Sequence, residues 1–334
     1  MRGVSLVLVP LLLLGGCGIF GGSSAKEERL SGFFSRAKGY YRNDRLQQAL
    51  DQVDRGLELE PGDPKFLTLK GFIFLKYARR DPSFYDDALA LFRKAAAGGL
   101  FHSGLTRAKL GLGLALLGRG IKERDYAANL EKALLEGSIP AARREEARKK
   151  VPEMRAYAHK DFQEAEGAFE EVLREEPRNI LALYSLALVK VALDKKEDGL
   201  KLIDRYIQAA SARRKQILER DLKITLSKER EDKLWAELRT IESREKECRG
   251  LAANLLYKLG RYEEALKELN SLLKLDPNLV NEYFNRARIH AKLGHTQEAV
   301  RDYRTFVGRS LLPREDPRIK EAMDYITRHA SEER

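Results

Sequence analysis

The sequence predicts an all-α protein built as a solenoid of stacked helix–turn–helix repeats. Three stretches place a proline twelve residues after a small residue, in the pairs Ala49 and Pro61, Ala165 and Pro177, and Ala265 and Pro277. A spacing of 34 residues separates three further pairs: Ala265 and Ala299, Ala253 and Ala287, and Ala165 and Gly199. A fixed period of this length is the signature of stacked repeats. With 34% charged and 43% hydrophobic residues, the composition suits a folded helical protein and argues against global disorder.

The N-terminus has the pattern of a secretory signal, with a basic start, a short apolar core and small residues at its end. The apolar core, Val4–Leu14, runs directly into Leu14-Gly15-Gly16-Cys17. This ending resembles the lipobox of bacterial lipoproteins, which implies that residues 1–16 are a signal peptide and that Cys17 is acylated. The alternative is a short uncleaved membrane anchor, but eleven apolar residues fall short of the roughly 20 needed to span a bilayer.

Residues 17–29 are predicted to form the acylated end of the mature chain and a short flexible tether. The resemblance implies two or three acyl chains, and two or more hold a protein stably to a membrane. Gly18 stands where an aspartate would indicate retention in the inner membrane, so the outer membrane is favoured. We therefore expect a location in the bacterial cell envelope, lipid-anchored and facing the periplasm.

The net charge of the precursor is +11, and removal of Arg2 with the signal peptide leaves +10. A positive balance often indicates nucleic-acid binding, but an exported chain does not meet the chromosome, so no nucleic acid is expected as a partner. Anionic phospholipid head groups or acidic protein segments are better candidates. Acylation of Cys17 leaves Cys248 without a disulfide partner, and we interpret Cys248 as a small core residue rather than a reactive thiol.

The 34-residue period resembles that of the tetratricopeptide repeat, in which two antiparallel helices, A and B, are joined by a tight turn. A proline ends helix B because it cannot continue the helical hydrogen bonds. The resemblance implies a right-handed superhelical solenoid, with repeats one to five at 30–212, repeats six and seven at 246–313, and a capping helix with a tail at 314–334. The repeats are expected at Leu30–Asp63, Pro64–Phe101, His102–Ile139 (degenerate), Ala142–Arg178, Asn179–Ala212, Lys246–Leu279 and Val280–Leu311.

Some repeats depart from the regular pattern. The second has extra residues near Arg79-Arg80-Asp81-Pro82, which predict an enlarged turn between its helices. The third is expected to open a similar turn at Gly118-Arg119-Gly120. The fourth has a weak A helix, with Glu153 where a small residue belongs. Beyond the last repeat, Pro317 suits the first position of the capping helix.

Residues 213–245 interrupt the period with a charged segment that contains no glycine or proline. Its apolar residues recur every three or four positions, as in one long amphipathic helix or two in succession. One interpretation is an arm that projects to contact a partner. The other, which we favour, is that helix B of one repeat and helix A of the next are lengthened and pack on each other. Trp235, the only tryptophan, is predicted to be in the core.

The sequence lacks the common motifs of catalysis. The five histidines are scattered, and no His-Glu-x-x-His or Cys/His cluster has metal-ligand spacing. The glycines around Gly111 and Gly120 lack the Gly-Lys-Ser/Thr of a phosphate loop, and no Gly-x-Ser-x-Gly elbow supplies a nucleophile. We therefore expect no enzyme activity, no cofactor, no metal and no small-molecule substrate.

Stacked helix pairs expose a concave wall, lined mainly by A helices, that binds extended peptides or helices. The resemblance places the groove candidates at Phe34, Lys38, Tyr41, Arg42, Phe72 and Lys76 in the first two repeats, and at Asn254, Tyr257, Lys258, Asn281, Asn285, Arg288 and Lys292 in the last two. Asn254 and Asn285 fall where the carboxylate-clamp members of the family hold a partner's C-terminal carboxylate. Because Gly250 stands at the position of the clamp's lysine, we predict a polar, basic groove rather than a clamp.

The predicted function is that of a membrane-anchored scaffold that recruits envelope proteins through its groove. Such a scaffold would assist the assembly of outer-membrane barrel, secretin or pilus complexes. The alternative is an accessory module that positions a periplasmic enzyme or transporter component, such as a peptidoglycan hydrolase. Cys17 precedes the first expected repeat by only thirteen residues, so the groove is expected to lie close to the membrane.

Overall fold

The computed structural model describes residues 21–99, 103–224 and 226–329. Within these ranges every regular element is a helix, which confirms the predicted all-α class. No helix in the described ranges is long and apolar enough to cross a membrane. The predicted signal peptide and the acylated Cys17 lie outside the described residues.

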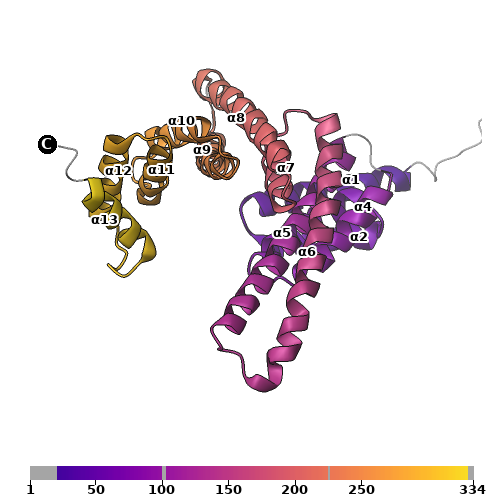
Figure 1. Cartoon of the computed structure of the whole chain (residues 1–334). Coiled ribbons are helices and arrows are strands. Elements are labelled where there is room, and N and C mark those ends of the chain that lie inside the picture. The colour runs from indigo at the N-terminus through magenta and orange to yellow at the C-terminus, as the bar shows by residue number, and fades with distance from the viewer. Residues whose placement is uncertain (1–20, 100–102, 225, 330–334) are drawn as a thin grey trace, which may run out of the picture. The chain divides into compact units, whose positions relative to one another are not determined.

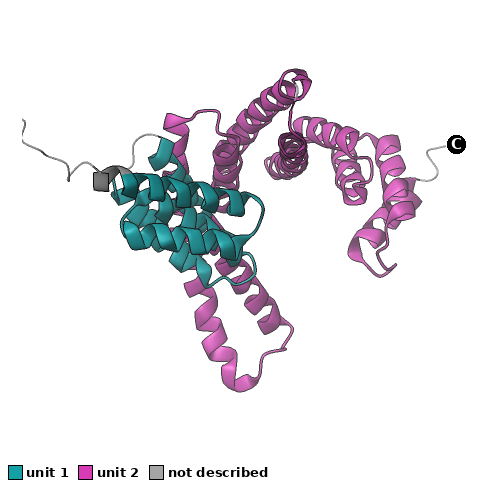
Figure 2. Cartoon of the chain, turned by 180° about the vertical axis from the view of Figure 1, so that it is seen from behind, with its two compact units in different colours: residues 1–115 teal, residues 116–334 magenta. Residues whose placement is uncertain are grey.

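The chain divides into two compact units, residues 1–115 and 116–334 (Figure 2). The first unit contains α1 Gly21–Arg42, α2 Leu46–Leu59, α3 Pro64–Ala78, α4 Phe84–Ala97 and the beginning of α5 Ser103–Leu135 (Figure 1). The second contains the rest of α5, then α6 Ala141–Glu175, α7 Ile180–Ala192, α8 Lys196–Glu219, a 3-10 turn η1 Asp221–Lys223, α9 Lys228–Lys258, α10 Tyr262–Leu275, α11 Val280–Lys292, α12 Thr296–Arg309 and α13 Pro317–His329.

Four of the turns between an A helix and a B helix share one backbone geometry. Each has a residue with a left-handed φ, namely Asp44 at 57°, Asp194 at 59°, Gly260 at 74° and Gly294 at 76°. The next N–H donates to the carbonyl five residues earlier, as from Arg45 to Tyr40 at 2.9 Å, and the other three turns repeat this bond. This is the Schellman way of ending a helix. The local sequence therefore sets where each helix A stops.

In the first unit, the fully buried Phe92 of α4 fills the space above two glycines. A β-carbon on Gly71 of α3 would lie 2.8 Å from this ring, and one on Gly111 of α5 would lie 2.2 Å from it. The Phe72 ring meets Phe92 edge-on, with centroids 5.1 Å apart. The glycines thus let α3 and α5 approach α4 closely enough for the ring to fill the space between them.

Of the two enlarged turns predicted from the sequence, only the one at residues 79–83, between α3 and α4, is formed. The prediction for Gly118-Arg119-Gly120 is wrong, because α5 continues through these residues to Leu135 (Figure 1). Gly120 serves as a point of close packing, since a β-carbon there would lie 2.8 Å from the Phe162 ring of α6. Arg119 forms two hydrogen bonds, of 2.8 and 2.7 Å, with the buried carboxylate of Asp161.

The fourth expected repeat also differs from the prediction of separate A and B helices. Residues 141–175 form the single helix α6, which continues through Pro152. The second half of this helix buries Ala165, Phe169 and Val172, as a B helix should. The structure therefore replaces two short helix pairs with two long helices, α5 and α6.

The charged segment 213–245 belongs to two lengthened helices that pack on each other. Arg213 of α8 makes two hydrogen bonds, of 2.7 and 2.9 Å, with Glu237 of α9. The Tyr206 hydroxyl donates to the carbonyl oxygen of Ile241 at 3.3 Å. These contacts describe the packed arrangement rather than an arm that projects.

The prediction that Trp235 lies in the core is wrong, because its side chain is 43% exposed. Leu234, Leu238 and Ile241 form the buried face of this part of α9, and the position next to Leu234 is turned about 100° away from that face. Cys248 is buried as predicted. Burial raises the pKa of its thiol to about 12, so the thiol stays protonated at neutral pH.

Helix α13 begins at Pro317, at the position expected from the sequence. Its buried residues Ile319 and Ala322 join a core cluster with Phe284 of α11 and Phe306 of α12. This helix therefore covers the apolar face that the last repeat would otherwise expose.

Candidate functional site

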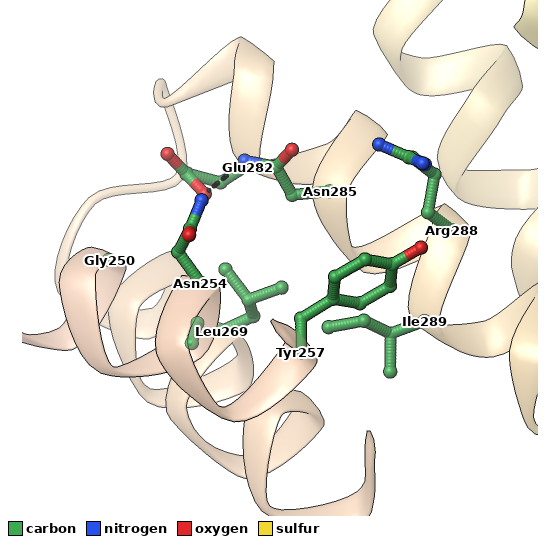
Figure 3. Close-up of a pocket in the computed structure, with 9 residues that line it drawn as sticks. Gly250, Asn254, Tyr257, Leu269, Glu282, Asn285, Arg288 and Ile289 are labelled. Atoms are coloured by element: carbon green, nitrogen blue, oxygen red, sulfur yellow. Dashed lines mark hydrogen bonds between the residues drawn. The ribbon is translucent and has the colours of Figure 1, made fainter. Parts of the chain in front are cut away.

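A cavity of about 190 Å³ lies where helices α9 and α11 face each other, with α10 beneath (Figure 3). Its lining combines apolar and polar side chains: Gly250, Ala253, Asn254, Tyr257, Leu269, Glu282, Asn285, Arg288 and Ile289. The lining residues of α9 stand at positions 250, 253, 254 and 257, and those of α11 at 282, 285, 288 and 289. On each helix they are spaced about one helical turn apart. One face of each helix therefore supplies the wall.

The floor of the cavity is apolar and the rim is polar. Ala253, Leu269 and Ile289 are buried, with at most 4% of each exposed. Asn254 and Asn285 are exposed, and they stand on opposite walls of the cavity (Figure 3). A floor that buries a small apolar group beneath a polar rim is the usual organisation of a binding pocket.

The polar groups of α11 are held in place by neighbouring side chains. The Asn285 amide donates to Glu282 Oε2 at 2.9 Å. The Arg288 guanidinium lies over the Tyr257 ring, 5.4 Å from its centroid, and Arg288 Nε is 3.2 Å from Glu321 Oε1 of α13. By contrast, the Asn254 side chain makes no hydrogen bond with any residue in the described ranges. Asn254 is therefore the polar side chain of the cavity most available to a ligand.

Four of the predicted groove residues line this cavity together: Asn254, Tyr257, Asn285 and Arg288. Lys258 and Lys292 are exposed but do not line it. The Asn281 side-chain oxygen accepts a hydrogen bond from Arg318 of α13 at 3.4 Å. Because Glu282 also lines the cavity, its charge is mixed rather than uniformly basic. Glu282 was missed, although its position three residues before Asn285 places it on the same helix face.

The groove residues predicted in the first repeats lie in the other unit, where two pairs of them are in contact. Phe34 packs edge-on against Phe66, with centroids 5.3 Å apart, and Lys38 Nζ lies 5.1 Å from the Phe34 ring. Lys76 Nζ lies 4.4 Å from the Tyr41 ring and donates to Asp44 at 2.8 Å. Arg42 is exposed, and Phe72 packs against Phe92 as described above. Their aromatic members are half-buried and pack against the core of this unit, so the cavity in the last repeats is the stronger candidate site.

Two stretches of the chain match models of the tetratricopeptide repeat, at residues 154–213 and 254–327. Both stretches are tetratricopeptide repeats. The second includes seven of the nine residues that line the cavity, all except Gly250 and Ala253. No curated protein matches the chain in sequence.

Several solved structures are similar to this chain, and two of the three described next are named as tetratricopeptide-repeat proteins. Pseudomonas aeruginosa pilF is 13% identical, with a TM-score of 0.52 over 90% of this chain and 99% of that chain. YrrB, a tetratricopeptide-repeat protein with an unusual peptide-binding site, is 14% identical, with a TM-score of 0.46 over 81% and 97% of the two chains. A thermophilic tetratricopeptide-repeat protein from Thermus thermophilus is 16% identical, with a TM-score of 0.36 over 80% and 98%. At 13% identity the likeness to pilF concerns the fold alone, and the other two structures, with TM-scores below 0.5, carry no argument.

The fold is an all-α tetratricopeptide-repeat solenoid, and repeats of this kind commonly serve as scaffolds for protein–protein interaction. In this register α9 and α11 are the A helices of consecutive repeats, and A helices carry the binding wall in such solenoids. The cavity therefore lies on the face that solenoids of this kind commonly use to hold partners.

Proposed function

We propose that this protein is a lipid-anchored adaptor of the bacterial envelope, which holds a segment of a partner protein in the cavity between α9 and α11. The observation that carries the proposal is the apolar floor beneath a polar rim, on the A-helix face of consecutive repeats. The membrane anchor rests on the resemblance of Leu14-Gly15-Gly16-Cys17 to a lipobox. Together they favour recruitment of partners for the assembly of outer-membrane barrel, secretin or pilus complexes.

The size of the cavity favours a peptide segment over a small-molecule ligand. A volume of about 190 Å³ is below the range of about 300–1,000 Å³ that is usual for small-molecule sites. It accommodates one apolar side chain against Leu269 and Ile289, while the backbone of the same segment meets Asn254 and Asn285 at the rim.

The position of Arg288 favours a partner segment that carries an acidic group. The side chains of Arg288 and Glu321 are 44% and 46% exposed, so their ion pair is weak, with a contribution of about 0–1 kcal/mol. A carboxylate of a bound segment can therefore replace Glu321 at little cost. We interpret Glu321 as an internal competitor for this position.

Site-specific photocrosslinking in intact cells tests the proposed adaptor function directly. A photoreactive amino acid at Asn254 or Asn285 should form adducts with an envelope protein, while the same group at the exposed positions Glu263 and Gln297 on B helices should not. Adducts with barrel, secretin or pilus subunits support the proposal. Adducts with a peptidoglycan hydrolase or a transporter component support the accessory module instead. Equal labelling from A-helix and B-helix positions would rule the cavity out.

Once a partner segment is identified, changes at Arg288 and Glu321 should act in opposite directions. Arg288→Ala is expected to weaken binding about tenfold or more, because it removes a charged hydrogen-bond donor. Glu321→Gln is expected to strengthen binding up to about fivefold, because it removes the competing carboxylate. Fluorescence anisotropy with the labelled segment measures both effects. Lys292→Ala, on the same helix but outside the cavity, is the control and should change nothing.

Replacement of Cys17 tests the proposed anchor independently of the cavity. Cys17→Ala should move the protein from the membrane fraction to the soluble periplasmic fraction, because each buried methylene of an acyl chain contributes about 0.8 kcal/mol. Cys248→Ala provides a matched control, since this second cysteine is buried and should leave membrane attachment intact. Immunoblots of fractionated cells measure both. Membrane attachment of the Cys17→Ala protein would contradict the lipid anchor.

A further inference from the structure

The Schellman turn of the repeats brings the side chains at positions i and i+5 together. In the first repeat, Arg45 stacks on the Tyr40 ring, 5.2 Å from its centroid. In the repeat of α7 and α8, the equivalent pair is Lys190 and Lys195, and both donate to the carboxylate of Glu166. In the last repeat, the same two positions hold histidines, at residues 290 and 295.

The two imidazoles of this last turn face each other through equivalent nitrogens. His290 Nδ1 and His295 Nδ1 are 3.3 Å apart. Zinc binds histidine nitrogens at about 2.0–2.1 Å in tetrahedral geometry, which places two nitrogen ligands about 3.3 Å apart. The separation is therefore that of two ligands on one metal ion. It is also compatible with a hydrogen bond between the rings, and the experiment below distinguishes the two.

A carboxylate behind His290 supports the metal interpretation. His290 Nε2 lies 4.0 Å from Asp302 Oδ2, beyond direct hydrogen-bond distance. The negative charge of the carboxylate favours a proton on the nearer nitrogen, Nε2, which leaves Nδ1 free to bind a metal. Metal-binding histidines usually direct their second nitrogen at such a carboxylate. Asp302 is itself buried and held by two hydrogen bonds from Arg286, of 2.6 and 2.8 Å. Asp302 is thus fixed before any ion arrives.

The site is accessible from solvent on one side. His295 is exposed at the surface of the turn, while the His290 side chain is only 12% exposed. Within the described residues, no third His, Cys, Asp or Glu joins the pair to complete a cluster. Water would therefore occupy the remaining coordination positions, as in a site of moderate affinity.

We propose that His290 and His295 bind a divalent transition metal ion through their Nδ1 atoms, with Asp302 orienting His290. Imidazole ligands favour Zn²⁺, Cu²⁺ and Ni²⁺ among such ions. The bound ion cross-links the end of α11 to the start of α12, the two helices of the last repeat. Because α11 also supplies Asn285 and Arg288 to the cavity, metal binding stabilises the helix pair that carries one wall of the partner site.

Zinc titration of the full chain, purified without a histidine tag, tests the proposal. Calorimetry should detect one equivalent of Zn²⁺ with a dissociation constant on the order of 10 μM, because two of the four ligands of a structural site supply about half of its binding free energy. In the unsubstituted protein, addition of Zn²⁺ should shift the imidazole ¹⁵N NMR signals of the Nδ1 atoms of two histidines. His295→Ala should weaken binding about 100-fold.

Two further variants distinguish the site from unspecific binding to histidine. Asp302→Asn should weaken zinc binding about 10–100-fold, as expected for a group that orients a ligand. His159→Ala, an exposed histidine on α6, should leave binding unchanged. Circular dichroism checks that each variant is folded. The proposal is wrong if Zn²⁺ up to about 1 mM leaves both Nδ1 signals in place, which would assign the pair to a hydrogen bond. It is also wrong if His159→Ala abolishes binding.

Discussion

Phe92→Ala is expected to lower the free energy of unfolding of the first unit by about 3–5 kcal/mol. The Phe92 ring is fully buried and fills the space above Gly71 and Gly111. Because both neighbours are glycines, no side chain on them can move in to occupy the cavity that the substitution leaves. Urea denaturation followed by circular dichroism measures the loss. A change below about 1 kcal/mol would mean that the three helices do not pack on this ring.

Two glycine-to-alanine changes should affect stability in opposite directions, because only one of the glycines lies against the Phe92 ring. Gly111→Ala should cost about 1–3 kcal/mol, because its β-carbon would lie 2.2 Å from the Phe92 ring. Gly39→Ala, in α1, has no atom within 4 Å of the new β-carbon. It should stabilise the protein by about 0.5–1 kcal/mol through helix propensity alone. Equal effects of the two changes would contradict the close packing of α5 on α4.

Glu245→Ala is expected to destabilise the second unit by about 3 kcal/mol. Glu245 is 3% exposed, and its carboxylate pairs with Arg214 of α8 at 3.0 Å and with Arg249 at 2.9 Å. Its removal leaves two guanidinium groups without their shared partner. The cost lies at the low end of the range for buried pairs, because Arg249 keeps a bond to Glu268 and the Arg214 side chain is 29% exposed.

Glu242→Ala is the matched control on the same helix. Glu242 is exposed and pairs with no residue in the described ranges, so its replacement should change stability by less than about 0.5 kcal/mol. Both variants are compared by chemical denaturation at neutral pH. If Glu245→Ala also falls within this limit, the ionic cluster does not hold α8 against α9.

The regular repeats could be predicted from the sequence because their signals are local. A proline follows each of the helices α2, α6 and α10 within two residues, at Pro61, Pro177 and Pro277. The small residues twelve positions earlier, Ala49, Ala165 and Ala265, are all fully buried at helix crossings. These features act over a few residues, so a period in the chain translates directly into a period in space.

Two predictions from the sequence were wrong, one for the glycines at 118–120 and one for Trp235. Glycine permits both a turn and a close helix crossing, and Gly118-Arg119-Gly120 was interpreted as a turn. The Phe162 ring that packs on Gly120 lies 42 residues further along the chain, and no local pattern indicates this contact. Trp235 was predicted to be in the core, but the helix turns the neighbouring Leu234 inward instead.

The candidate site was predicted in part, by register. Counting along the A helices placed Asn254, Tyr257, Asn285 and Arg288 on the binding face, and they do line one cavity. Register shows which face a residue occupies, but it does not show what a neighbouring helix offers. Helix α13 brings Glu321 to Arg288 and Arg318 to Asn281, and these contacts decide which groups stay available to a partner.

By itself, the sequence determined the helix pairs of the regular repeats, the ends of their helices and the face that the A helices expose, because proline, left-handed turn residues and apolar periodicity act on the adjacent backbone. The tertiary structure decided the length of α5 and α6, the exposure of Trp235 and the pairing of the cavity's polar groups. It also decided that His290 and His295, which looked scattered in the sequence, face each other across a turn. Each of these depends on how segments are placed in three dimensions, which no spacing along the chain specifies.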